Sequence, residues 1–233
     1  MTYEEASTLG VGITTVGQAM YQSLGLPLPG SDQVPAGVPI LIYGASSATG
    51  TLAVQFAKLS GCSPIITTSS PHNFDLLRSL GADAVFDYKD PDCAKKIRDY
   101  TKDGLAHAVD CIATAETAEI TSNAIGSGGG MVSYLLSPKH ERKDVRAGYT
   151  VGYTVVGEYF KFRDVEYPAN PADLEFGIEF WALTEKLLAE GRIRPHPVEV
   201  GKDGLKGVFA GCQAMREGRV SGKKLVYRVE ETP

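Results

Sequence analysis

A short stretch of small, hydroxyl-bearing residues is suited to binding an anion. Residues 43–50 read YGASSATG, and they offer backbone N–H groups together with serine and threonine hydroxyls. Small side chains let the backbone of such a turn approach a phosphate closely. The candidate phosphate-binding residues are Ser46, Ser47, Ala48, Thr49 and Gly50.

This turn lies between an apolar run and a helical pattern. Residues 38–43 have the length of a buried strand, and residues 48–59 repeat apolar side chains at helical spacing. A strand, a tight turn and a helix direct free amides and the positive end of the helix dipole at an anion. In a doubly wound sheet the pyrophosphate of a dinucleotide binds there. Ala45 and Ser47 replace two glycines of the usual fingerprint, so an ordinary strand-to-helix turn is the alternative.

The next expected strand ends in neutral donors. Residues 67–73 read TTSSPHN, and the nearest carboxylate is Asp75. An acid about 20 residues after the glycine turn would bind the ribose of NAD, whereas neutral donors and a histidine suit the 2′-phosphate of NADP. The pattern therefore favours NADP, and the alternative is that Ser70 only caps a helix beginning at Pro71. The candidate binding residues are Ser69, Ser70, His72 and Asn73.

Residues after the later strands complete the candidate cofactor site. Tyr88 is expected either to stack on the adenosine or to pack against the protein. Lys89 is expected either to contact a phosphate or to stay solvated. The ends of the fourth and fifth strands are expected to meet the nicotinamide through Cys111, Ile112 and Leu135. As apolar positions, these three also fit a plain core role.

Composition excludes several classes. The chain has 233 residues and a net charge of -5, with no basic patch for nucleic acid. Its four cysteines are far apart in sequence, which argues against a zinc cluster and for a reduced, cytoplasmic protein. Neither a membrane span nor a secretory signal is expected. The cysteines are Cys62, Cys93, Cys111 and Cys212.

Strands and helices alternate along most of the chain, which predicts an α/β fold with a doubly wound parallel (Rossmann) sheet. Strands are expected at residues 38–43, 64–68, 84–87, 106–112, 131–135, 150–156 and 224–229, and residues 193–200 are expected to be extended. Helices are expected at residues 3–24 with a break near 10–12, and at 48–59, 72–80, 92–100, 115–125, 173–190 and 205–217. Residues 25–37 and 160–171 are expected to be loops.

Several motifs occur in the order of a known family. They are EEA at 4–6, the turn GASSATG, SPHNFDL at 70–76, GAD at 81–83, FDY at 86–88 and SGKKLV at 221–226. Together they resemble the medium-chain dehydrogenases/reductases, and in particular the fungal trans-acting enoyl reductases that work with polyketide synthases. The resemblance extends over nearly the whole chain. It implies an NADPH-dependent, zinc-free oxidoreductase that transfers hydride to the β-carbon of an enoyl thioester.

The resemblance also implies a domain organisation. Members of the family carry an N-terminal GroES-like β-domain before their equivalent of residues 4–6, and this sequence starts beyond it. We expect residues 1–30 to be a helical lead-in from the substrate domain, residues 31–160 the dinucleotide-binding domain, and residues 161–233 a return segment of the substrate domain. A naturally shortened protein, an alternative gene start and an isolated domain would each give such a chain. Self-association into a homodimer is one way to recover a substrate cleft.

No residue is assigned as catalytic from the sequence. The histidines 107, 140 and 196 fit structural or solvated roles, and nothing selects a proton donor among Tyr134, Tyr149, Tyr153 and Tyr159. A hydrolase is disfavoured because the Gly-x-Ser-x-Gly elbow is missing. Three hypotheses stay open: an NADPH-dependent reductase of a small-molecule or carrier-bound acyl substrate, partnered by a polyketide synthase; a non-redox biosynthetic enzyme on the same sheet; and an inactive binding module.

Overall fold

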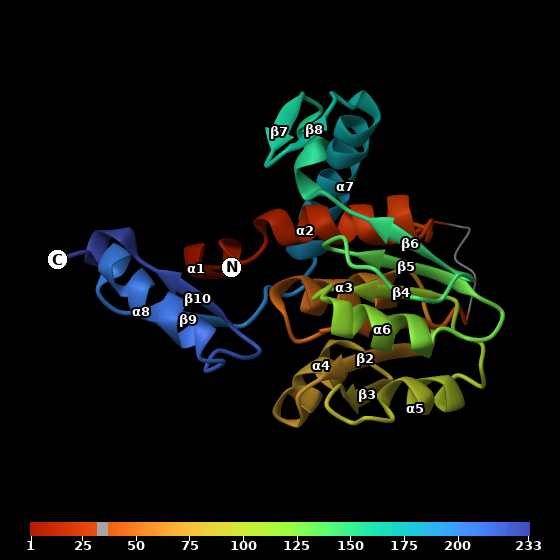
Figure 1. The fold of residues 1–233 in the computed structure, drawn as a ribbon. Coiled ribbons are helices and arrows are strands. Elements are labelled where there is room, and N and C mark those ends of the chain that lie inside the picture. Colours follow the sequence, from red (N-terminus) through yellow and green to blue (C-terminus); the bar gives the residue numbers. More distant parts are fainter. Residues whose placement is uncertain (32–36) are drawn as a thin grey trace.

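The computed structural model describes residues 1–31 and 37–233, and its centre is a parallel sheet of six strands (Figure 1). These strands are β1 (Ile40–Tyr43), β2 (Ile65–Ser69), β3 (Ala84–Asp87), β4 (His107–Asp110), β5 (Gly130–Tyr134) and β6 (Val145–Tyr149). Their spatial order is β3-β2-β1-β4-β5-β6, with every neighbouring pair parallel. The predicted doubly wound α/β sheet is confirmed.

Helices cover both faces of this sheet. They include α3 (Ala48–Leu59), α4 (Phe74–Leu80) preceded by the 3-10 helix η2 (Pro71–Asn73), α5 (Cys93–Tyr100) and α6 (Ala115–Ala124). All residues of β1 are buried: Ile40 and Ile42 belong to the core on the α3 side, and Leu41 to the core on the side of α5 and α6. Burial on both faces explains why this strand is a continuous apolar run.

The N-terminal helix is divided at a different place than its glycines suggest. It consists of α1 (Tyr3–Ala6), α2 (Gly10–Gly17) and the π-helix η1 (Gln18–Ser23). The predicted division into two helices is confirmed, but the break lies at residues 7–9 and not at 10–12, because α2 begins at Gly10 and continues through Gly12. A Cβ on Gly12 would lie 3.1 Å from Leu52 Cδ1, and one on Gly17 would lie 2.5 Å from the Phe180 ring. These glycines therefore permit close helix packing.

The sixth strand lies earlier than predicted. β6 occupies Val145–Tyr149, whereas Gly152–Val156 forms the 3-10 helix η3. The apolar residues of η3 pack on the helix α7 (Pro171–Ala189), where Val155 closely approaches Gly177. β6 is an edge strand, and it carries the exposed Arg146 because edge strands tolerate charge. Apolar content alone therefore pointed to the wrong segment.

Two smaller units complete the fold. Within the predicted 160–171 loop, the strands β7 (Phe160–Phe162) and β8 (Val165–Tyr167) form an antiparallel hairpin, so the loop prediction is wrong there. The C-terminal unit, shown in blue in Figure 1, consists of β9 (Val198–Gly201), α8 (Gly204–Arg216), β10 (Lys224–Tyr227) and the 3-10 helix η4 (Val229–Glu231). β9 and β10 pair in parallel as a separate sheet.

Polar contacts connect the C-terminal unit and the segment before it to the helices α1 and α3. The Arg194 N–H donates to Gln55 Oε1 at 2.8 Å, and Arg228 Nε donates to Glu4 Oε1 at 2.7 Å. The predicted 25–37 loop includes residues 32–36, which lie outside the described residues. Within the described residues, no helix has both the length and the apolar character needed to cross a membrane.

Candidate functional site

A cavity of about 760 Å³ lies where the carboxyl ends of β1, β2 and β4 meet. Between β1 and β4 the strand order changes direction, which is the place where doubly wound sheets bind ligands. The cavity is lined by the β1–α3 turn, the residues after β2, β3 and β4, the first turn of α6, and part of the C-terminal unit. Segments far apart in sequence therefore share one site.

The β1–α3 turn has the shape that the sequence predicts. Gly44 adopts a φ of +69°, and a Cβ there would lie 2.5 Å from Ile112 Cγ1. A Cβ on Gly50 would lie 2.5 Å from the Gly44 carbonyl oxygen. Ser47 caps α3 by accepting a hydrogen bond from the Gly50 N–H at 3.0 Å. Glycine is thus needed where helix and strand approach most closely.

Three of the five predicted phosphate-binding residues line the cavity: Ser46, Ser47 and Ala48. Thr49 is half-buried and Gly50 is buried, and neither lines it. The Gly50 N–H is occupied by the Ser47 cap, whereas the N–H groups of Ala48 and Thr49 have no carbonyl one turn earlier in the helix and can bind an anion. The turn therefore fits a phosphate mainly through backbone amides.

The predicted 2′-phosphate residues divide into two groups. Ser69 and Ser70 line the cavity, whereas His72 and Asn73 do not and instead contact Ser221 of the C-terminal unit. Ser70 stands at the N-cap of η2, but its side chain makes no capping hydrogen bond. The alternative that Ser70 serves only as a helix cap is therefore wrong. Its hydroxyl is available at the cavity wall.

Tyr88 packs against the protein, as one of its two predicted roles requires, and it also lines the cavity. Its ring lies edge-on to Tyr43 with the ring centroids 6.4 Å apart. Lys89 does not line the cavity, and its Nζ lies 5.9 Å from the Tyr88 ring centroid. A base entering the cavity would therefore meet an aromatic ring whose orientation is already fixed by a neighbour.

Of the three residues expected to meet the nicotinamide, only one lines the cavity. Ile112 lines the cavity, whereas Cys111 lies behind it in contact with Ser47, and burial raises the pKa of the Cys111 thiol. Leu135 packs against the core on the α3 side and does not line the cavity. β4 also ends at Asp110, earlier than predicted, so Cys111 and Ile112 belong to the turn after this strand.

Asp110 is a residue that the sequence analysis missed. Its fully buried carboxylate accepts hydrogen bonds from the N–H of Ile112 at 3.0 Å, the N–H of Ala113 at 2.8 Å and Thr117 Oγ1 at 2.8 Å. Burial raises its pKa. These bonds hold the turn after β4, where Ala113 has a left-handed φ of 58°. An aspartate closing an apolar strand, with a threonine one to two turns later, is the signal that could have revealed it.

The C-terminal wall of the cavity was also missed. It comprises His196, Met215 and residues 220–225. His196 is 2% exposed, its Nδ1 lies 2.9 Å from Thr51 Oγ1, and burial lowers its pKa to about 4. His196 is therefore neutral near pH 7. A histidine flanked by prolines gave no indication of this packing.

The remaining histidines and tyrosines lie elsewhere. His107 is half-buried in β4, and His140 lies beside the Tyr134 ring with the ring centroids 5.9 Å apart. Tyr134 is buried, with no hydrogen-bond partner for its hydroxyl among the described residues. None of the tyrosines proposed as proton donors, at positions 134, 149, 153 and 159, lines the cavity. The proton donor stays unassigned.

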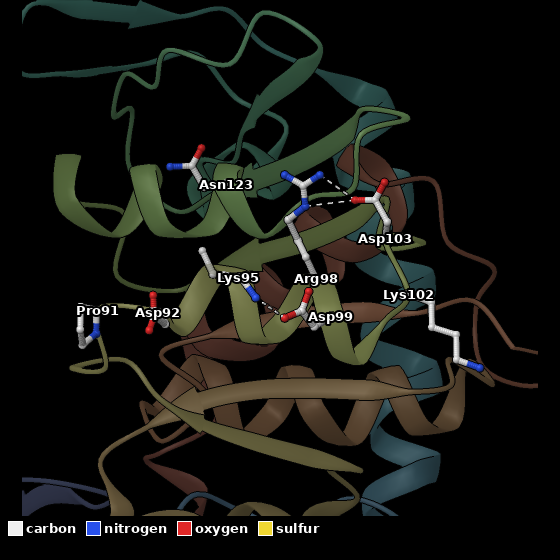
Figure 2. A pocket seen from close by; sticks show the side chains of 9 residues that line it. Pro91, Asp92, Lys95, Arg98, Asp99, Lys102, Asp103 and Asn123 are labelled. Carbon is white, nitrogen blue, oxygen red and sulfur yellow. Dashed lines mark hydrogen bonds and ion pairs between the residues drawn. The ribbon is translucent and has the colours of Figure 1, made fainter.

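A second cavity, between α5 and α6, has a different character. It is lined by alternating cations and carboxylates that pair with one another, such as Arg98 with Asp103 and Lys95 with Asp99 (Figure 2). Asp103 also accepts the Ser127 N–H at 3.0 Å. Charges that are already paired attract a further ion weakly. This cavity is therefore not a candidate active site.

Comparison with known proteins defines the class. The zinc-binding dehydrogenase family matches residues 48–163, the part that contains the last three residues of the phosphate turn, α3, and β2 to β6. Among solved structures, the CurK enoyl reductase superposes with a TM-score of 0.72 at 19% identity, over 97% of this chain and 64% of that one. The JamJ enoyl reductase gives a TM-score of 0.72 at 15% identity. These two likenesses show a shared fold.

Sequence relatives narrow the class to one family. Trans-enoyl reductase resD of Aspergillus sclerotiorum is 45% identical over 98% of this chain and 68% of that protein. Trans-enoyl reductase ACTTS2 of Alternaria alternata is 49% identical over 99% of this chain and 66% of that protein. The chain belongs to the trans-enoyl reductase family. The dual trans-enoyl reductase/FAD-dependent monooxygenase tazHJ of Aspergillus terreus is 62% identical over 94% of this chain and 31% of that protein.

The chain thus spans about two thirds of the first two relatives and about a third of tazHJ. The name of the matching dehydrogenase family mentions zinc, so we tested the donor set. Among residues 1–31 and 37–233, no group of three histidine, cysteine or acidic side chains is arranged to hold a metal ion. The residues present do not fit a resident zinc ion, and no catalytic step is assigned to one.

Proposed function

We propose that this chain binds NADPH and forms the nucleotide-binding part of a reductase that acts on enoyl thioesters of polyketide biosynthesis. The observation that carries the proposal is the cavity at the switch point of the sheet, with the N-terminus of α3 and the hydroxyls of Ser46 and Ser47 at one end. Family membership supports the same reaction class. The amides of α3 would bind the pyrophosphate.

The choice of NADPH over NADH rests on the residues at the carboxyl end of β2. Ser69 and Ser70 line the cavity there, and no carboxylate of this segment does. Asp75, the nearest acid, has a 98% exposed side chain that pairs with Arg78 at 3.1 Å. A ribose 2′-hydroxyl would therefore lack its usual acidic partner, whereas a 2′-phosphate would find neutral donors, with His72 behind them in contact with the lining residue Ser221. Tyr88 would pack against the adenosine.

The residues of this chain would position the reactants. Bound NADPH would supply a hydride to the β-carbon of the enoyl thioester, and a proton would be added at the α-carbon, giving the saturated thioester and NADP⁺. The turn held by Asp110 keeps Ile112 against Gly44, so the wall near the reacting ring is apolar. An apolar wall excludes water from the hydride donor.

The proposed substrate is a small or carrier-bound acyl thioester, and the proposed partner is a polyketide synthase. We assign residues 31–160 to nucleotide binding, and residues 1–30 and 161–233 to the substrate side, with the exception of His196, Met215 and residues 220–225, which line the nucleotide cavity. An apolar groove of about 1150 Å³ supports this division, because the N-terminal residue Leu9 and the α7 residues Ile178 and Trp181 line it together. Groups from both flanking segments thus form one surface.

Two measurements test the proposal. We expect saturable binding of NADPH in a fluorescence titration, and oxidation of NADPH when crotonyl-CoA is added. Ala48→Asp would place a carboxylate in the phosphate turn and should abolish binding, whereas Ala172→Asp, in the exposed first turn of α7, should not. Absence of saturable binding would contradict the cofactor assignment, and binding without oxidation would favour a non-redox role for the same cavity.

A further inference from the structure

The loop between α8 and β10 forms one wall of the cavity. Residues 220–223, which we name the C-terminal strap, all line it. The strap crosses to the residues after β2, which lie about 150 positions earlier in the chain. Its residues 221–223 read SGK and begin the SGKKLV motif, to which the proposed function assigns no role.

Ser221 contacts two of the residues expected to recognise a 2′-phosphate. Asn73 Nδ2 donates to Ser221 Oγ at 2.9 Å, and Ser221 Oγ also lies 2.9 Å from His72 Nε2. Asn73 is 6% exposed, so its amide is fixed by packing. The hydroxyl therefore links a buried amide to an exposed imidazole.

This chain of hydrogen bonds holds one side of the imidazole. Ser221 Oγ accepts from Asn73 Nδ2, and it keeps both a hydrogen and a second lone pair, so it can pair with His72 Nε2 in either tautomer of the ring. The second ring nitrogen of His72 lies outside the contact with Ser221. Ser221 therefore constrains the orientation of the ring and leaves that nitrogen for another partner.

The strap itself is held in place on both sides. Gly222 has a φ of +68°, and a Cβ there would lie 2.3 Å from Asn73 Oδ1, so the strap lies directly on the Asn73 amide. Lys223 forms an ion pair with Glu199 of β9, and its backbone hydrogen bonds with the buried His196. Ser221 is therefore presented by a fixed backbone.

We propose that Ser221 is a positioning residue for nucleotide selectivity: its hydrogen bonds with Asn73 and His72 orient the imidazole beside the cavity wall, where the ring is available to the 2′-phosphate of NADPH. This inference rests on the proposed function, because it assigns a role at the same cavity. Ser221 acts through His72 and is not required for the ring or the pyrophosphate to bind. Its contribution is accordingly specific to NADPH.

The test compares dissociation constants for NADPH and NADH. Ser221→Ala should weaken NADPH about fivefold, the factor for one neutral hydrogen bond, and leave NADH unchanged. Ser221→Thr keeps the hydroxyl and should restore NADPH binding. Ser79→Ala, which removes an exposed hydroxyl on α4 that bonds only to Leu76 O, is the matched control and should affect neither cofactor. Thermal unfolding of each variant verifies that it folds.

A double-mutant cycle distinguishes positioning from a local structural role. In a His72→Ala background, Ser221→Ala should produce no further loss of NADPH affinity. Equal losses for NADPH and NADH, or additive losses in the cycle, would overturn the inference while leaving the proposed function intact. Tighter NADPH binding by Ser221→Ala would also overturn it, because Ser221 would then be competing with the phosphate. If the unmodified protein binds neither cofactor, the proposed function itself fails, and the inference with it.

Discussion

Replacing Gly50 with alanine introduces a methyl group into space that the backbone already occupies. The new Cβ would lie 2.5 Å from the Gly44 carbonyl oxygen, 2.6 Å from Ala45 Cα and 2.8 Å from the Ala45 carbonyl carbon. All three atoms belong to the backbone of the β1–α3 turn, so no flexible side chain can move away. The start of α3 must shift from β1, and the amides proposed to bind phosphate must shift with it.

The magnitude is the sum of two opposing contributions. Overpacking of this kind destabilises by about 3 kcal/mol, and the better helix propensity of alanine returns about 1 kcal/mol. We therefore expect a net loss of about 2 kcal/mol in the free energy of unfolding. In a chain of this length that lowers the melting temperature by roughly 4–8 °C. NADPH affinity should fall at least about tenfold, because hydrogen bonds to a phosphate depend on amide placement.

The assays are thermal unfolding and NADPH titration, with Gly10→Ala as the control. Gly10 also lies in a helix, and a Cβ there would have no atom within 4 Å, so this variant should equal or slightly exceed the original stability. A Gly50→Ala protein with unchanged melting temperature and NADPH affinity would refute the reasoning. Reduced stability with normal affinity would refute only the link from turn geometry to phosphate binding.

Three other changes have measurable outcomes. Gly222→Ala should weaken NADPH binding about fivefold more than Gly218→Ala does. Both glycines have a φ near +68°, but of the two only a Cβ at position 222 would meet an atom, Asn73 Oδ1. Equal NADPH affinities of the two variants would contradict this prediction. Acidification from pH 7 to 4.5 should lower the free energy of unfolding by about 2 kcal/mol through His196. The pKa of His196 is about 4 in the folded protein and higher in the unfolded chain, so the unfolded chain binds the proton first as the pH falls. In denaturant unfolding, the His196→Gln variant should not show this pH-dependent loss of stability. Asp110→Asn should lower the free energy of unfolding by about 1–3 kcal/mol. The new amide NH₂ group would face N–H groups and hydroxyls that donate to the carboxylate in the original protein. The control Asp75→Asn, at an exposed position, should change the free energy of unfolding by under about 0.5 kcal/mol.

The sequence predicted correctly those elements whose local signals match the way they pack in the fold. The β1 run, the capped start of α3 at Ser47 and the end of α4 at Gly81 each carry a local signal, namely a continuous apolar run, an N-cap and a left-handed glycine. The position of β6 was predicted wrongly because an edge strand needs little hydrophobicity. The position of the break in the N-terminal helix was predicted wrongly because a glycine that permits helix contact, such as Gly12, looks the same in sequence as one that breaks a helix.

The candidate site was predictable only where it is local. Ser46, Ser47 and Ala48 lie in one turn, and their common role can be inferred from that turn alone. The wall from His196 and the C-terminal strap depends on contacts across about 145–150 positions, which no periodicity reveals. Leu135 shows the opposite error, because being near a strand end does not decide whether a side chain faces the cavity or the core.

The distribution of the cavity along the chain has a consequence for how nucleotide selectivity is built. The dehydrogenase family matches residues 48–163, and this part contains only the last three residues of the phosphate turn together with the residues after β2. Ser221, which contacts His72 and Asn73, lies beyond that match. Under the two proposals above, the backbone amides at the N-terminus of α3 would bind any diphosphate, whereas the orientation of His72 would depend on Ser221. The affinity for a dinucleotide and the preference for NADPH over NADH should therefore vary independently. Substitutions in the C-terminal strap should alter the preference and leave the affinity for NADH unchanged. Substitutions in the phosphate turn should weaken the binding of NADPH and NADH together.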